Sequence, residues 1–195
     1  MRASNGLAVV LALTITLVAG PDVSAHRSED YLQAARVDLH PDSVLITLDL
    51  TPGIDVAESF MAAVDHDRDG SLATEEQIRY ARQVVRALEI EIDGRPLPPR
   101  VISWSFPDPS AFRQGEGTIR LKVQATFPRV SAGSHQFLFR NAHLAGHSAY
   151  LANALVPDSA RVTVTTQRRN TDQSKLTIEY TVHAEARFVP SQNLN

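Results

Sequence analysis

The chain has 195 residues, of which 43% are hydrophobic and 21% charged, a composition typical of a folded globular protein. It contains no cysteine, which excludes disulfides, cysteine-ligated zinc or iron–sulfur sites and thiol nucleophiles. The formal net charge of −3 provides no basic field that would draw the protein to nucleic acid, so we expect no nucleic-acid partner.

The first 25 residues have the pattern of a secretory signal peptide. Arg2 is followed by an apolar run over residues 7–19, and small residues at 23–25 precede His26. The run is shorter than the ~20 apolar residues of a membrane span, and no later segment is long and apolar enough. We therefore expect cleavage before His26, export to the periplasm or the medium, and no stable membrane span afterwards.

Most of the remaining sequence alternates between apolar and polar residues. The alternating segments are 35–39, 44–50, 88–92, 102–106, 119–127, 137–139, 162–164 and 176–182. Such alternation is typical of strands with one buried and one exposed face, and here it places Trp104 in the core. Eight or nine short strands separated by turn residues predict an antiparallel β-sandwich over residues 26–184, followed by a polar tail over 185–195.

Between residues 51 and 87 the apolar period changes to about 3.6, which predicts helices. One apolar stripe includes Phe60 and Val64, and a second includes Ala81 and Val84. The sequence thus predicts a mainly β fold with a helical hairpin inserted between the second and third strands.

The segment between the two helical stripes, residues 65–76, reads DHDRDGSLATEE and has the ligand spacing of a calcium loop. Ca²⁺ prefers six to eight oxygen ligands, and a glycine at the sixth position, here Gly70, permits a sharp backbone turn. Leu72 is expected to anchor the loop to the core, and a water to replace the oxygen that Ala73 lacks. The expected ligands are the side chains of Asp65, Asp67, Asp69 and Glu76 and the backbone carbonyl of Ser71.

Residues 51–87 resemble an EF-hand: the loop has the EF-hand pattern, and apolar residues flank it on both sides. The resemblance implies a helix–loop–helix that binds Ca²⁺. EF-hands normally occur in pairs, and the sequence holds no second D-x-D-x-D-G motif. We therefore expect the β-sandwich, a protein partner or a second copy of the chain, as in a homodimer, to cover the unpaired hand.

A broader resemblance covers nearly all of the sequence after the leader. His26, the DLTPG run at 49–53 and the YLANALVP run at 150–157 are similar to the exported amino-terminal domain of some bacterial metal-permease proteins. In those proteins a β-rich domain with a D-x-D-x-D-G loop precedes membrane helices. Since no such helices are expected here, the resemblance implies a free-standing exported domain.

Two other functions are compatible with the sequence. As the mature amino terminus, His26 would offer an amine and an imidazole to Cu²⁺ or Ni²⁺, and His143 and His147 are spaced to meet on one helical face. A periplasmic copper or nickel carrier is therefore one alternative, and a protein-interaction module is the other. No nucleophile–base pair is recognisable, so we do not expect an enzyme. The leading expectation is an exported calcium-binding protein with a structural, assembly or low-affinity sensing role.

Overall fold

The computed structural model describes residues 31–184. The expected signal peptide, His26 and the polar tail expected from residue 185 lie outside the described residues. Within residues 31–184, no helix is long and apolar enough to cross a membrane.

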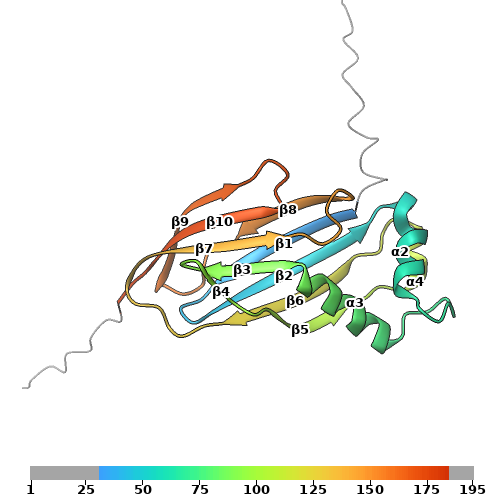
Figure 1. Ribbon diagram of the computed structural model, residues 1–195, viewed down its shortest axis with the longest axis horizontal. Coiled ribbons are helices and arrows are strands. Elements are labelled where there is room, and N and C mark those ends of the chain that lie inside the picture. Colours follow the sequence, from blue (N-terminus) through green and yellow to red (C-terminus); the bar gives the residue numbers. More distant parts are fainter. Residues whose placement is uncertain (1–30, 185–195) are drawn as a thin grey trace, which may run out of the picture.

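The described chain is mainly β and forms two five-stranded sheets (Figure 1). In order, the first sheet contains β5 (Arg100–Ser105), β6 (Ile119–Thr126), β2 (Ser43–Pro52), β1 (Tyr31–Leu39) and β8 (Ser148–Ala154). The second contains β4 (Arg95–Pro96), β3 (Leu88–Ile92), β7 (Gly133–Asn141), β10 (Lys175–Val182) and β9 (Val162–Arg169). The predicted sandwich is confirmed at this level, with one difference: β1 and β8 pair in parallel.

The alternating sequence pattern explains how the sheets share one core. In β2, Val44, Ile46, Leu48 and Leu50 are fully buried, and the residues between them face partly outward. In β10, Leu176 and Ile178 have no exposed surface and join the same apolar cluster. Full burial of each such side chain contributes roughly 1.5–3 kcal/mol, so the core is the main source of stability.

The exposure of Trp104 corrects the expectation that this residue belongs to the core. Trp104 is 38% exposed on β5, which is an edge strand of the first sheet. The pairing of β5 with β6 shifts between Val101 and Ser103, which leaves Ile102 as an extra, 50% exposed residue. Trp104 pairs with buried Leu121 and so lies on the core side of the sheet, but it is exposed because no strand of the described residues covers the outer edge of β5. The bulge takes Ile102 out of the alternating row, so simple alternation fails in this strand.

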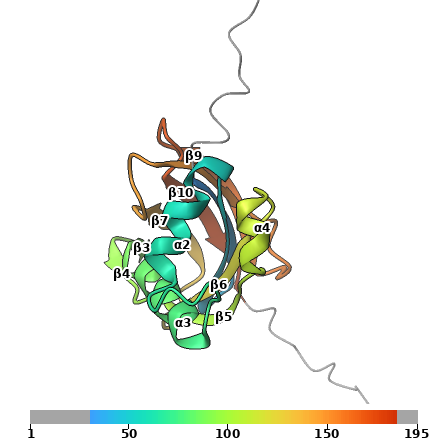
Figure 2. The same cartoon turned by 90° about the vertical axis from the view of Figure 1, so that its right-hand side faces the viewer.

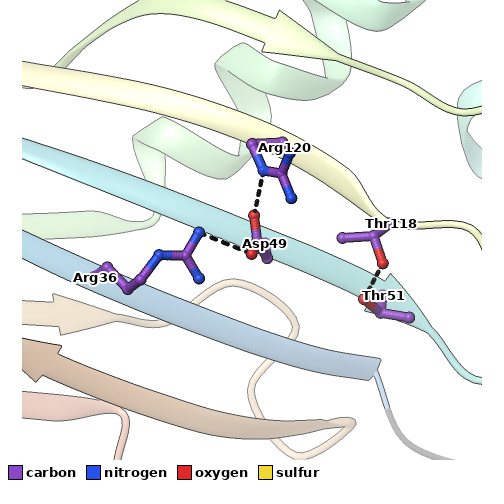
Figure 3. A network of polar contacts seen from close by, with 5 residues as sticks. All are labelled: Arg36, Asp49, Thr51, Thr118 and Arg120. Carbon is purple, nitrogen blue, oxygen red and sulfur yellow. Dashed lines mark hydrogen bonds and ion pairs between the residues drawn. The ribbon is translucent and has the colours of Figure 1, made fainter.

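A charged network crosses the outward face of the first sheet (Figure 3). Asp49 on β2 lies between two arginines, with 2.8 Å from its Oδ2 to Arg36 on β1 and 2.9 Å from its Oδ1 to Arg120 on β6. Beside it, the hydroxyls of Thr51 and Thr118 lie 2.8 Å apart. The network therefore links three neighbouring strands on their polar side.

The helices gather at one end of the sandwich (Figures 1 and 2). A short turn of 3-10 helix, η1 (Ile54–Val56), leads into α2 (Ala57–Val64), and α3 (Thr74–Arg86) follows after the intervening loop. A further short helix, α4 (Pro109–Arg113), is capped by the preceding Asp108, whose side chain accepts a hydrogen bond from the Ser110 amide. Figure 1 shows that β1 starts at this helical end, whereas β10 ends at the opposite one.

Candidate metal site

Three carboxylates meet in the loop between α2 and α3. The side chains of Asp65, Asp67 and Glu76 each offer an oxygen, and these oxygens lie within 4.8 Å of one another. Asp65 is 7% exposed and Glu76 is 5% exposed, whereas Asp67 is open to solvent. Since buried carboxylates repel each other at this separation, the cluster could hold a metal ion.

The two helices position the buried pair. Asp65 directly follows α2, and its amide donates to the carbonyl of Met61 at 2.8 Å. Glu76 lies in the first turn of α3. Phe60 and Val64 on α2 and Val84 on α3 pack into the core, so both helices are fixed to the sandwich. Core packing therefore sets the distance between the two carboxylates.

The loop folds back on its own amides. Asp65 Oδ2 accepts a hydrogen bond from the Gly70 amide at 2.9 Å. Asp67 Oδ1 accepts from the Asp69 amide at 3.2 Å. Arg68 and Gly70 both have left-handed backbones, with φ of 61° and 84°, which glycine adopts without a steric penalty. The predicted sharp turn at Gly70 is present.

Glu76 closes the loop through both of its oxygens. Oε2 accepts a hydrogen bond from the Ala73 amide at 3.0 Å, which satisfies one of the free donors at the start of α3. Oε1 accepts from the amide of His66 near the beginning of the loop. Each carboxylate oxygen has a second lone pair, so these bonds leave Glu76 able to bind a cation as well.

One oxygen of Asp65 has no partner. Among residues 31–184, Asp65 Oδ1 is buried and lacks a hydrogen-bond partner. Leaving a charged oxygen buried and unpaired costs free energy, and the neighbouring acids increase that cost. A cation would satisfy this oxygen and neutralise the cluster, so the residues present fit a metal ion.

The structure brings together three of the five expected ligands. Asp69 lies outside the cluster, because its Oδ1 accepts hydrogen bonds from the amide of Ser71 at 2.8 Å and from its hydroxyl at 2.6 Å. These bonds lower the pKa of Asp69. Ser71 is exposed, and its role as a backbone ligand stays a prediction. Leu72 packs against the core, as expected for the loop anchor.

The two histidines of the transition-metal alternative lie in the turn between β7 and β8. His143 is buried, and its Nε2 lies 3.1 Å from the hydroxyl of Tyr80, whereas His147 is exposed. The turn is not helical, since Leu144 and Gly146 have φ of 51° and 84°. Within the described residues, the acidic loop is the one group of three or more metal-binding side chains.

No protein-family model matches this chain, and no curated protein is similar to it. The functional conclusion therefore rests on the geometry and chemistry of the described residues.

Proposed function

We propose that the protein is an exported calcium-binding protein that holds one Ca²⁺ in the loop at residues 65–76. The observation that carries the proposal is the buried, unpartnered Oδ1 of Asp65 beside the carboxylates of Asp67 and Glu76. The EF-hand pattern of the sequence supports the same assignment.

The donor set favours calcium over a transition metal. All side chains of the cluster offer oxygen, and hard cations such as Ca²⁺ prefer oxygen, whereas Cu²⁺ and Ni²⁺ prefer nitrogen ligands. Asp65, Asp67 and Glu76 would hold the ion with the Ser71 carbonyl. Asp69 would join them when its carboxylate turns from Ser71 toward the ion.

A structural or low-affinity sensing role fits this site better than rapid signalling. Extracellular calcium modules typically bind with dissociation constants of ~10⁻⁴–10⁻³ M, and Ala73 adds no oxygen at the ninth loop position. Binding would remove carboxylate repulsion and secure α2 against α3. Calcium should therefore stabilise the folded protein, and this gain should rise with the logarithm of the calcium concentration above the dissociation constant.

Calorimetric titration of the purified protein with Ca²⁺ tests the proposal. The wild type should give saturable heat at millimolar calcium, and Glu76→Gln should lose it. Glu75→Gln is the matched control, because it removes the same charge from an exposed neighbour outside the cluster. Absence of calcium-dependent heat in the wild type, or equal loss in both variants, would contradict the proposal.

A further inference from the structure

A cavity of about 230 Å³ lies beside the helical end of the sandwich. Its walls come from α2, α3, the start of β1 and the turn between β7 and β8. The rings of Tyr31, Phe60, Tyr80 and His143 form much of the lining. Leu144 also lines it and is 42% exposed, so this side of the cavity reaches the surface.

The rings surround the cavity in edge and stacked arrangements. Phe60 and Tyr80 meet edge to face with centroids 5.4 Å apart, and Tyr31 stacks on Phe60 at 6.0 Å. His143 meets Tyr80 edge to face at 5.6 Å. Aromatic walls of this kind favour a flat aromatic occupant through the same geometries. An apolar cavity of ~150 Å³ accepts benzene, so this one has room for a benzene ring with a small substituent.

Three polar groups in the lining form a chain of hydrogen bonds. The hydroxyl of Tyr31 bonds with the hydroxyl of Tyr80, which bonds in turn with His143 Nε2 at 3.1 Å. Burial lowers the pKa of His143 to about 4 and raises the pKa values of Tyr31 and Tyr80. At neutral pH all three groups are therefore uncharged, and each carries one hydrogen that it can donate.

The series of hydrogen bonds through Tyr31, Tyr80 and His143 always leaves one donor without an acceptor. Three hydrogens serve two hydrogen bonds, so one hydrogen remains in either direction of the chain. If Tyr31 donates to Tyr80 and Tyr80 to His143, the hydrogen left over is on Nδ1 of His143. If the direction is reversed, it is the hydroxyl hydrogen of Tyr31. All three residues line the cavity, so an occupant that brings an oxygen acceptor would satisfy the remaining donor.

The backbone of His143 is held firmly, which makes the polar chain a prearranged feature. The carbonyl of His143 accepts from Gln33 Nε2 at 2.8 Å and from the hydroxyl of Tyr150 at 2.7 Å. Its amide donates to Asn141 Oδ1 at 3.0 Å. The polar groups therefore need little rearrangement to receive a ligand, which lowers the cost of binding.

We infer that the cavity is a binding site for a small, uncharged aromatic molecule that carries one oxygen, of the class of phenol. The ring packs among Tyr31, Phe60 and Tyr80, and the oxygen accepts the hydrogen that the Tyr31–Tyr80–His143 chain leaves over. This site is separate from the acidic loop and does not depend on the metal assignment.

Titration with phenol, followed by the NMR signals of the cavity residues, tests the inference. The titration is run both in chelator and in millimolar calcium, and saturation in either buffer supports the inference, so that failure of the calcium proposal leaves this result unaffected. Phenol should shift these signals saturably at millimolar concentration. Benzene should bind about fivefold more weakly, because it lacks the one hydrogen bond. Absence of saturation, or equal binding of the two molecules, would overturn the inference.

Two neighbouring alanines on α2 provide a matched pair of variants. Ala63 lines the cavity, so Ala63→Phe should fill it and abolish phenol binding. Ala62 is exposed and outside the lining, and Ala62→Phe should leave binding unchanged. Thermal melts confirm that both variants fold. If the Ala62 and Ala63 variants weaken phenol binding equally, it does not occur in this cavity.

Discussion

Glu76 accepts a hydrogen bond from the amide of His66, ten residues earlier in the chain. This bond joins the end of the acidic loop to its beginning. The second Glu76 oxygen accepts from Ala73, so one side chain both closes the loop and starts α3. The hydrogen bonds of Glu76 therefore fix its carboxylate beside those of Asp65 and Asp67, in a cluster that could hold a metal ion.

Asp65→Asn is expected to have opposite effects with and without calcium. The amide oxygen of asparagine can still accept from Gly70, while the charge beside Asp67 and Glu76 is removed. Relief of repulsion should raise the calcium-free stability by roughly 1 kcal/mol. The calcium-dependent rise in melting temperature should disappear. Thermal melts in chelator and in millimolar Ca²⁺ measure both effects, and a lower calcium-free stability would contradict the repulsion.

How far the sequence predicts this site depends on the distance between the residues concerned. The positions of Asp65, Asp67 and Glu76 follow a local pattern, and the helices on either side follow from local periodicity. Asp69 lies toward Ser71 because the Ser71 amide donates a hydrogen bond to its Oδ1. The spacing of the acidic residues in the sequence does not specify which acceptor this amide uses. The expected ligand set was therefore broader than the cluster that the structure brings together.

Features built from distant residues were not predicted. The Tyr31–Tyr80–His143 chain joins residues 49 and 63 positions apart, and no local motif signals it. The parallel pairing of β1 with β8 likewise depends on a long-range choice of neighbour. The bulge takes Ile102 out of the alternating row of an edge strand, where burial does not impose strict alternation. Alternation predicted the sandwich but not these details.

The His135–Asp93 pair should make stability depend on pH. His135 Nδ1 lies 2.8 Å from Asp93 Oδ2, and its Nε2 lies 2.9 Å from the Ser131 carbonyl. Both partners are acceptors, and only the protonated ring can donate to both. Partial burial opposes protonation of His135, but these two bonds raise its pKa above 6.5. Burial alone would raise the pKa of Asp93, whereas hydrogen bonds from Gln136 and His135 lower it below 3.8.

The directions of the His135 and Asp93 pKa shifts define the pH range over which the pair stabilises the folded protein. The His135 contribution is fully present below its unfolded pKa of 6.5 and is lost as pH rises through the higher folded pKa. The Asp93 contribution is present above 3.8 and is lost as pH falls through the lower folded pKa. The His135–Asp93 pair should therefore stabilise the folded protein most between pH 3.8 and pH 6.5. Melting temperatures of wild type and His135→Gln should differ most near pH 5 and converge above neutrality; a constant difference would contradict the linkage.

Gly117→Ala should be strongly destabilising, because the glycine lies against a buried ring. A Cβ at this position would approach Phe112 Cδ1 to 2.5 Å and the Phe112 amide nitrogen to 2.9 Å. Phe112 has no exposed surface and contacts Phe60 on α2, so it has little room to move. We expect a loss of about 2–3 kcal/mol by chemical denaturation. A loss below ~0.5 kcal/mol would mean that α4 can shift freely.

Asp49→Asn should destabilise the sheet through charge rather than packing. The carboxylate separates Arg36 from Arg120 on the outward face of three strands (Figure 3). Asparagine keeps the shape and one acceptor oxygen but leaves two cations facing a neutral group. The arginine side chains are 39% and 57% exposed, so solvent screens them and the loss of stability should be about 1 kcal/mol or less.

Urea denaturation of wild type and Asp49→Asn at low and high salt measures this loss of stability. The difference from wild type should shrink at high salt, because mobile ions screen the repulsion between the arginines. A difference that does not change with salt would show that Asp49 acts through its hydrogen bonds alone.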